Sequence, residues 1–507
     1  MKNINETDYE LLTRILDEEV VYYTDKANCD SVYVEYPNYN GNTSFVSISS
    51  RKFQNFVVAR YAELSETDTY PDFTDAIKTR TSVAAFKTIN PVIITNRVFG
   101  SISSGKITYD LASETDKPFV VIKEDGVSLK STTKNFKFLR NATDKAQVTP
   151  TEGTDSDVFT LLTPYINMDE SSLKLFVIHL IQLFSRSSSH FATIISSSKG
   201  TGKTTLTKLV SSLIAPSEID AVVTSNSDSD LKTTLAGNYF VAFDNTTALS
   251  TSYSNILCAA ITGSKEAKRK LYTDSDKVIL TLHSAVFING IDIVPHQSDL
   301  AERSLLFELQ PITHDKRIPE REFWDRFDAD KPVILSAIFH TLSKAMTCLK
   351  DIKTEKLHRM AEANKEMLAI AVALGITEEE FQTLLDGNRN TMDEKYSENS
   401  TFVDTIVDFI AVQGSQRTFA SALYSAVKDF YDGQPSLFPG SASQFSRKLE
   451  QEREALQKCG ITVIRSKDSK TNCTIIELIS PNFPQKKKRS DGYPCKKVNS
   501  LLENAND

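Results

Sequence analysis

The sequence predicts an α/β core that is preceded by an α+β domain and followed by a domain of helices and strands. Three observations support this prediction. A loop of small residues, Ser196 to Thr205, connects the apolar run Phe191 to Ile195 to a segment with helical spacing. A second apolar run, Tyr239 to Phe243, ends at a carboxylate. Beyond residue 396, three helix-like stretches are followed by two strand-like stretches.

The loop has the spacing of a phosphate-binding loop. Its glycines let backbone N–H groups converge on phosphate oxygens at a helix N-terminus. Lys203 supplies a cation for the β and γ phosphates, and Thr204 offers a hydroxyl to Mg²⁺. Ser197 stands where the pattern G-x-x-x-x-G-K-[ST] begins with glycine, and a serine can still make this turn. The expected nucleotide-binding residues are Ser198, Lys199, Gly200, Thr201, Gly202, Lys203, Thr204 and Thr205. The alternative is a surface loop that contains Gly-Lys-Thr by chance.

Downstream strands carry the other candidate catalytic side chains. The strand that ends at Asp244 can place this carboxylate beside the loop, where it would hold Mg²⁺ directly or through water. At the end of the next apolar strand, the Asn289 amide would orient the attacking water, or it would form an ordinary Asn-Gly turn. Arg303 would reach a γ phosphate across a subunit boundary. Its alternative role is a salt bridge to Glu302 or Asp299.

A basic segment, residues 262–280, lies between the strand that ends at Asp244 and the strand that has Asn289 at its end. Its turn, Asp274 to Asp276, predicts a hairpin with basic side chains at one root. These side chains suit contacts with a phosphate backbone, whereas a solvated edge hairpin is the alternative. The candidate DNA-binding residues here are Lys265, Lys268, Arg269 and Lys270.

Composition and charge indicate which other kinds of site and which cellular locations to expect for this chain. The net charge of −8 means that a polyanion must be met by local basic patches. The six cysteines lie far apart, which favours reduced thiols over a zinc or redox site. The richest apolar stretch, Leu173 to Phe184, is interrupted by polar residues, so we expect no membrane span. The polar N-terminus lacks the apolar core of a secretory signal, and we expect a cytoplasmic protein.

The last domain has the order of a winged helix. Helical spacing over residues 402–410, 419–431 and 441–456 precedes strand patterns over 460–465 and 474–478. The third helix offers Gln444, Arg447 and Lys448 to a duplex groove or backbone. Winged helices also dock on proteins, and this alternative stays open.

Taken together, these blocks resemble the P-loop ATPases of bacterial phages, plasmids and integrated elements, which are related to superfamily 3 helicases and to the helicase part of viral primase-helicases. The resemblance implies an AAA+-like P-loop NTPase core, usually a ring around nucleic acid, with ATP and Mg²⁺ bound. Asn245 stands where many AAA+ enzymes carry the glutamate that polarises water. The identity of the general base is therefore open: Glu302 or Asp244 would compensate, or hydrolysis would be slow. The blocks are Ser197 to Thr204, Phe243 to Asn245, Ile261 to Asp274, Phe287 to Ile291, Asp299 to Ser304 and His358 to Glu362.

We expect six segments along the chain. They are an N-terminal α+β domain (1–115), a β-rich connector and linker (116–160), the P-loop ATPase core (161–315), a helical collar or lid (316–395), the winged-helix domain (396–480) and a basic tail expected to be disordered (481–507).

The expected function is an ATP-dependent DNA motor, a replicative helicase of a mobile genetic element. Its catalytic residues would be Lys203, Asp244, Asn245, Asn289 and Arg303, with Thr204 and Asp244 at the metal. DNA is the expected partner, single-stranded in a ring and duplex at the winged helix. Because an arginine that acts in trans needs a neighbouring subunit, we expect a homo-oligomer, a hexamer. The alternatives are a nucleotide-gated initiator, regulatory or defence ATPase without unwinding activity, and a small-molecule kinase.

Overall fold

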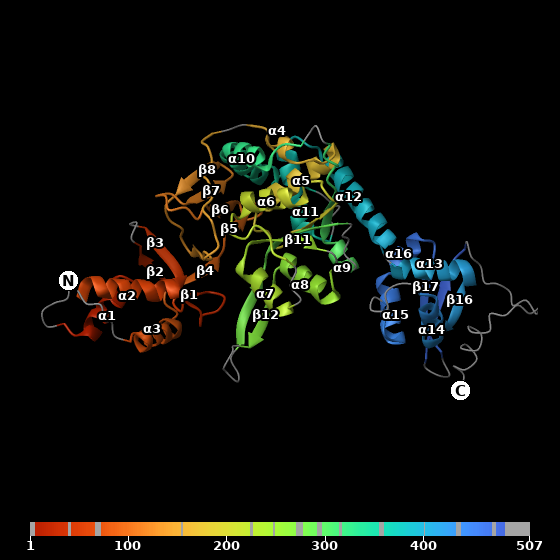
Figure 1. Ribbon diagram of the computed structural model, residues 1–507, viewed down its shortest axis with the longest axis horizontal. Helices are drawn as coiled ribbons and strands as arrows, with labels where there is room; N and C mark the ends of the chain where they lie inside the picture. Colours follow the sequence, from red (N-terminus) through yellow and green to blue (C-terminus); the bar gives the residue numbers. More distant parts are fainter. Residues whose placement is uncertain are drawn as a thin grey trace, which may run out of the picture. The chain divides into compact units, whose positions relative to one another are not determined.

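The computed structural model describes residues 6–38, 42–65, 72–153, 156–223, 227–246, 249–269, 277–291, 297–313, 317–353, 359–399, 401–431, 438–468 and 473–481 (Figure 1). The chain divides into two compact units. The first contains residues 1–247, 252–293 and 303–386, and the second contains 248–251, 294–302 and 387–507. Lys270, the predicted turn Asp274 to Asp276 and the predicted tail beyond Pro481 lie outside the described residues.

The first unit begins with a five-stranded sheet and three helices. The sheet has the strand order β3-β2-β1-β4-β9. Strand β2 alternates buried Val32, Val34 and Tyr36 with half-exposed residues, because only its inner face packs on the helices. The elements are α1 (Asp8–Glu18), β1 (Val21–Asp25), β2 (Val32–Pro37), β3 (Thr43–Ser47), α2 (Arg51–Ser65), α3 (Thr74–Lys87), β4 (Pro91–Thr95) and β9 (Phe136–Phe138).

A second, antiparallel sheet has the order β5-β6-β7-β8. Its strands are β5 (Val98–Ser101), β6 (Lys106–Asp110), β7 (Phe119–Lys123) and β8 (Gly126–Lys130). The predicted domain boundary after residue 115 falls between β6 and β7, which pair along their whole length. Strand β9 of the predicted connector also joins the N-terminal sheet, through β4. The predicted division between an N-terminal domain and a connector therefore has to be corrected, because hydrogen-bonded ladders cross it.

The core of the first unit is a four-stranded parallel sheet with the order β11-β14-β10-β15. All residues of β10 and β14 are buried, as expected for strands covered on both faces. The strands are β10 (Ala192–Ser196), β11 (Phe240–Thr246), β14 (Ala285–Gly290) and β15 (Ser304–Phe307). The helical elements nearby in sequence are α4 (Val158–Leu162), η1 (Thr163–Tyr165), α5 (Glu170–Gln182), α6 (Lys203–Ile214), α7 (Asp228–Gly237), α8 (Thr251–Thr262) and α9 (Ser298–Ala301).

The predicted basic hairpin is present and longer than expected. Strands β12 (Ser264–Arg269) and β13 (Lys277–Leu282) pair antiparallel from Ser264 opposite Leu282 to Arg269 opposite Lys277. The basic residues therefore lie along β12 itself, not only at its root. Three long helices follow the core: α10 (Glu320–Cys348), α11 (Ala361–Ala373) and α12 (Glu378–Asn399). Within the described residues, we find no helix long and apolar enough to cross a bilayer.

The second unit has its own core of buried side chains, which includes Phe402, Phe445 and Leu478. A three-stranded sheet, in the order β16-β18-β17, packs with its helices. The predicted third helix is two helices, and β16 is a strand that the sequence pattern did not indicate. The elements are α13 (Thr401–Gln413), β16 (Gln416–Phe419), α14 (Ala420–Phe430), α15 (Ala442–Gln451), α16 (Arg453–Lys458), β17 (Thr462–Lys467) and β18 (Thr474–Ile479).

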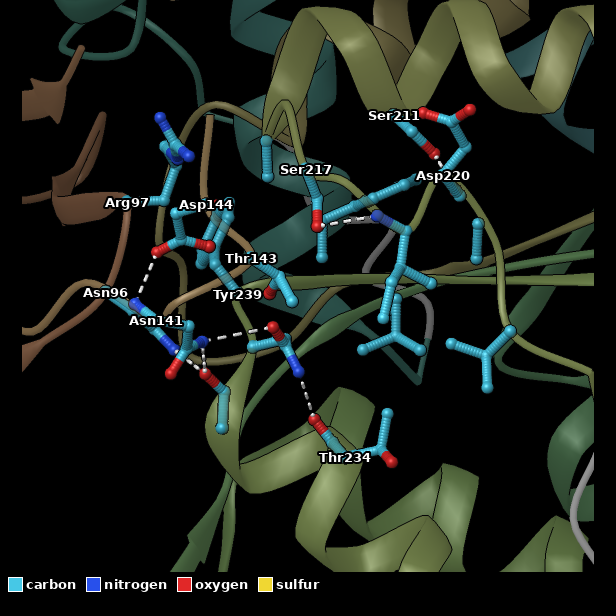
Figure 2. A pocket seen from close by; sticks show the side chains of 18 of the residues that line it. Asn96, Arg97, Asn141, Thr143, Asp144, Ser211, Ser217, Asp220, Thr234 and Tyr239 are labelled. Carbon is cyan, nitrogen blue, oxygen red and sulfur yellow. Dashed lines mark hydrogen bonds between the residues drawn. The ribbon is translucent and has the colours of Figure 1, made fainter. Parts of the chain in front are cut away.

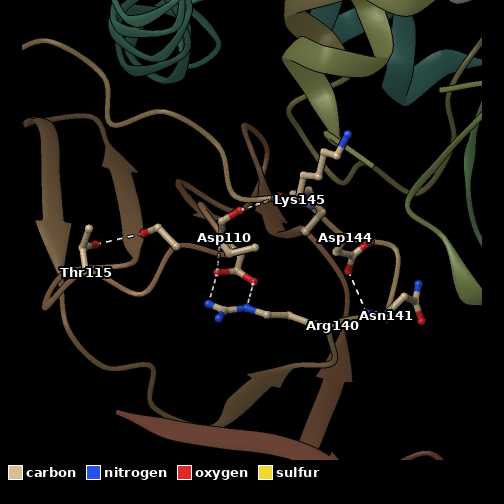
Figure 3. Close-up of polar contacts among 9 residues, drawn as sticks. Asp110, Thr115, Arg140, Asn141, Asp144 and Lys145 are labelled. Atoms are coloured by element: carbon tan, nitrogen blue, oxygen red, sulfur yellow. Dashed lines mark hydrogen bonds and ion pairs between the residues drawn. The ribbon is translucent and has the colours of Figure 1, made fainter. Parts of the chain in front are cut away.

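An ion pair between the buried Asp110 and the half-exposed Arg140 connects β6 to the chain after β9. Arg140 donates from Nε and Nη2 to the two carboxylate oxygens of Asp110, at 2.8 and 2.7 Å (Figure 3). Asp110 is buried, and its Oδ1 also accepts from the backbone N–H of Ala112 at 2.9 Å. Nearby, the buried Arg97 donates to the carbonyl oxygens of Asp110 and Pro216, both at 3.2 Å. These contacts join the second sheet to the segment after α6.

We predict that Arg140→Ala destabilises this junction by about 2 to 4 kcal/mol, because it leaves a buried carboxylate without its bidentate partner. The free energy of local opening, measured by hydrogen exchange of the β6 and β7 amides, checks this value. The matched control is Lys145→Ala, which removes a solvent-exposed ion pair to Glu218 and should change the exchange little. Equal exchange in the two variants would contradict the prediction.

Candidate functional site

The loop between β10 and α6 has the backbone geometry that an anion site needs. Gly200 and Gly202 have positive φ values of 78° and 88°, a region that residues with a side chain rarely adopt. Gly202 is the N-cap of α6, and no side chain caps this end of the helix. The first N–H groups of α6 are therefore not bonded to a capping side chain, and the helix dipole favours a negative charge there.

Lys203 is the first residue of α6, and its amine lies against the loop. Its Nζ donates to the carbonyl oxygens of Ser197 and Ser198, both at 2.6 Å. The Thr201 hydroxyl also donates to the Ser198 carbonyl, at 3.2 Å. These bonds hold the ammonium group within the curve of the loop, where it could donate a hydrogen bond to a phosphate oxygen.

Ser197 explains the departure of the loop from the glycine pattern. Its φ is not positive, so this position does not require glycine. Its hydroxyl accepts a hydrogen bond from the backbone N–H of Leu309 at 2.7 Å, and both residues are buried. The serine thus anchors the loop to the segment after β15. This contact could not be predicted from a local pattern, because the two residues are far apart along the chain.

Asp244 lies beside the loop, at the carboxyl end of β11. Its Oδ1 is 3.4 Å from Oγ1 of Thr204, which donates to it. The Thr204 side chain is exposed and Asp244 is half-exposed, so both are accessible from solvent. A hydroxyl and a carboxylate at this separation form a donor set that suits Mg²⁺, which prefers oxygen ligands and keeps several waters. The structure brings these two predicted metal residues together.

Asn289 joins three elements at the same edge of the sheet. Its Oδ1 accepts from the backbone N–H of Asn245 at 3.0 Å, and its Nδ2 donates to the Thr207 hydroxyl of α6. Thr207 in turn donates to the Lys203 carbonyl at 2.9 Å. Asn245 has a φ of +54°, a left-handed conformation that asparagine tolerates better than most residues. The amide of Asn289 is therefore held by protein groups on both sides, a link that the sequence did not indicate.

Arg303 lies at the amino-terminal end of the parallel strands, whereas the loop lies at their carboxyl end. It directly precedes β15, whose Ser304 is paired with Ala192 at the start of β10, whereas the loop follows the end of β10. The start of β10, next to Arg303, and its end, where the loop begins, are four residues apart, which is about 13 Å at the usual rise per residue of a strand. The half-exposed Arg303 is thus not brought together with the loop of its own chain.

A pocket of about 690 Å³ opens beside the loop, a volume in the range of small-molecule sites. Apolar side chains from three distant segments line it, including Ile166, Ile312 and Phe323. Lys208 and Arg317 are at its polar part, and a Cβ on Gly200 would lie 3.9 Å from Nη2 of Arg317. The sequence could not indicate this pocket, because only the fold brings the segments 163–167, 309–312 and 317–323 to the loop.

A second pocket, of about 250 Å³, lies along the amino-terminal half of β11 (Figure 2). Asn141 donates from Nδ2 to the Gly237 carbonyl at 2.8 Å and to Oδ1 of Asn238 at 3.2 Å. Asn238 donates in turn to the Thr234 carbonyl at 2.9 Å. These amides already bond to protein groups, and ligands of parallel sheets bind at the carboxyl ends of the strands. The pocket beside the loop is therefore the stronger candidate.

The predicted DNA-binding residues lie in both units. In the first, Lys265 is exposed on β12, where the neighbouring Glu266 forms an ion pair with Lys232 at 2.6 Å. Lys268 and Arg269 belong to the same strand. In the second unit, α15 carries exposed Gln444 and Arg447, while Lys448 forms an ion pair with the buried Glu452 at 2.6 Å.

We predict that Ser197→Gly, which restores the usual loop pattern, weakens the loop instead of improving it. The variant leaves the buried Leu309 N–H without its acceptor, at a cost of about 1 to 3 kcal/mol. Hydrogen exchange at the Leu309 amide measures this effect. Ser198→Gly, at the exposed neighbouring position, is the control for the added backbone freedom. Unchanged protection of the Leu309 amide in Ser197→Gly would show that the prediction is wrong.

Comparisons with known proteins give similarities over different parts of the chain. The A-form apo structure of the NrS-1 C-terminal region is 13% identical, with a TM-score of 0.39, over 93% of this chain and 99% of that one. A JCV helicase with a bound acetamide compound is 13% identical, with a TM-score of 0.24, over 46% of this chain and 66% of that one. The chain matches no curated protein. Residues 157–393, from the start of α4 into α12, match the family described as actinomycete integrative conjugative element replication protein.

Proposed function

We propose that the chain is an ATP-dependent DNA motor that acts in replication. The observation that carries this proposal is the meeting of four groups at one edge of the parallel sheet: the uncapped N-terminus of α6, the Lys203 amine, the Thr204 hydroxyl and the Asp244 carboxylate. Together they offer N–H groups, a cation and oxygen ligands, which are what a nucleoside triphosphate with Mg²⁺ requires. The match of residues 157–393 to a replication protein family supports the biological setting.

Each residue has a proposed part in ATP hydrolysis. The loop amides and Lys203 would hold the β and γ phosphates, and the pocket lined by Ile166, Ile312 and Phe323 would hold the base. Thr204 and Asp244 would hold Mg²⁺, which neutralises phosphate charge when it is bound. Asn289 would keep Asn245 and Thr207 in place around the γ phosphate.

Arg303 supports an assembly of several chains. It lies at the far edge of the sheet from its own loop, so a guanidinium that stabilises charge on the γ phosphate would have to serve a neighbouring chain. A ring, for which we propose six subunits, would repeat this contact at every interface. Lys265 on β12 would then contact single-stranded DNA.

The second unit is proposed to be a winged helix. Its order of helix, strand, three further helices and a strand pair has β16 as the first strand and β17 and β18 as the wing hairpin. Gln444 and Arg447 on α15 are exposed, as a helix that contacts duplex DNA requires.

One observation favours a second function, a nucleotide-gated initiator or regulatory ATPase. Asn245 cannot act as a carboxylate base, and both polar atoms of the Asn289 amide already bond to protein groups. Hydrolysis would then be slow and would only reset an assembly. Tight ATP binding with little turnover and no strand separation would select this alternative.

We predict that single-stranded DNA stimulates ATP hydrolysis, and that Lys203→Ala and Arg303→Ala are each inactive. Mixed together, the two variants should recover part of the activity, because some interfaces then pair an intact loop with an intact arginine from another chain. Steady-state phosphate release measures the rates.

The control for the mixture is Arg321→Ala, which removes an exposed arginine of α10 and should be as active as the unaltered chain. A mixture of Lys203→Ala and Arg303→Ala that stays inactive would contradict action in trans. A rate that does not respond to DNA would contradict the motor and favour the nucleotide-gated alternative.

A further inference from the structure

The N-terminal sheet has two faces of different character. The face on the helices buries Val34 and Tyr36 in an apolar cluster. Because side chains alternate along a strand, Tyr23, Tyr33 and Phe45 point to the other face. All three rings are half-exposed, and none belongs to that apolar cluster. We call these three rings the aromatic face.

The rings of the aromatic face form one contiguous surface. Tyr33 and Phe45 are stacked, with ring centroids 5.6 Å apart and planes at 15°. Tyr23 meets Phe45 edge-on, at 5.6 Å and 73°. The three rings lie on adjacent strands, and each leaves part of its apolar area in water.

Two opposite charges beside these rings form an ion pair. Lys137 on β9 donates from Nζ to the two carboxylate oxygens of Glu35, at 2.7 and 2.8 Å. The Tyr23 hydroxyl also donates to Glu35, at 2.7 Å. The Lys137 ammonium lies 5.1 Å from the centroid of the Tyr23 ring. Lys137 and Glu35 therefore neutralise each other, and an aromatic surface without excess positive charge suits the flat faces of bases better than phosphate groups.

The basic hairpin lies near the carboxyl end of β1, the central strand of this sheet. Burial raises the pKa of Asp25, the last residue of β1, and the positive charge of Lys265 on β12 opposes this rise, so each side chain lies within range of the other's charge. Lys265 is exposed, so its charge is available to a phosphate backbone next to the aromatic face. An aromatic stacking surface beside a basic strand is the combination that binds single strands without reading their sequence.

We propose that the aromatic face of Tyr23, Tyr33 and Phe45 stacks the bases of single-stranded DNA, while Lys265 on the hairpin contacts the backbone of the same strand. This inference rests on the proposed function, in which the chain acts on DNA. Duplex DNA does not fit the aromatic face, because paired bases are already stacked on one another and do not present their flat faces.

The test measures the affinity of the full chain for a fluorescent oligo(dT) strand and for an abasic strand of the same length. We expect Tyr33→Leu and Phe45→Leu to weaken oligo(dT) binding at least about 5-fold each, the lower end of one base–aromatic stack. Tyr23→Phe keeps its ring and should bind as the unaltered chain does. Binding of the abasic strand should not change in any of the three variants.

Salt dependence separates the aromatic face from the hairpin. The ring variants should keep the slope of log affinity against log salt concentration, whereas Lys265→Gln should reduce it by about one unit. Tyr9→Leu is the matched control, because it removes an exposed ring of α1. Thermal unfolding of each variant verifies that the fold is intact.

The outcomes separate this inference from the proposed function. An unaltered chain that binds no single-stranded DNA contradicts the proposed function. Binding that is equal in Tyr33→Leu, Phe45→Leu and Tyr9→Leu contradicts the aromatic face alone. If the ring variants lose affinity equally for oligo(dT) and for the abasic strand, the inference about the aromatic face is also overturned. If they change the oligomer mass instead of the DNA affinity, the aromatic face is a contact between copies of the chain.

Discussion

The left-handed backbone at Gly200 and Gly202 is the constraint on which the candidate site depends. These two positions turn the chain sharply from β10 into α6 and leave the helix N-terminus without a capping side chain. At Gly202 a Cβ would lie 3.5 Å from Cδ1 of Ile312, so the segment after β15 also approaches the loop closely there. Once this turn is made, Lys203 and Thr204 occupy the first turn of α6, where an anion would bind.

The parallel sheet explains which side chains meet and which do not. Strands β10, β11 and β14 deliver the loop, Asp244 and Asn289 to the same edge, because the carboxyl ends of parallel strands coincide. The same rule places Arg303, which precedes its strand, at the other edge. The fold thus brings most of the candidate site together in one chain but separates Arg303 from it, and this separation is the physical reason to propose a multi-chain assembly.

Local patterns were enough to predict the strand, loop and helix of the site, the strand that carries Asp244 and the hairpin. In each case the determining residues are neighbours in the sequence. Three features depend on contacts between distant residues and could not be predicted: the hydrogen bond from Leu309 to Ser197, the pairing of β9 with β4, and the pocket lined by residues of the segments 163–167, 309–312 and 317–323. Strand β16 was missed because its four residues become a strand only by pairing with β18.

The central claim is that the loop around Lys203 binds a nucleoside triphosphate with Mg²⁺. Calorimetric titration of ATP into the full chain, with Mg²⁺ and with a chelator, tests it most directly. We predict saturable binding that weakens when the metal is removed and falls about 10- to 100-fold in Lys203→Ala, since charge-assisted hydrogen bonds to phosphate are lost. A folded chain that takes up no ATP, or that binds it equally well with Lys203→Ala, would contradict the claim.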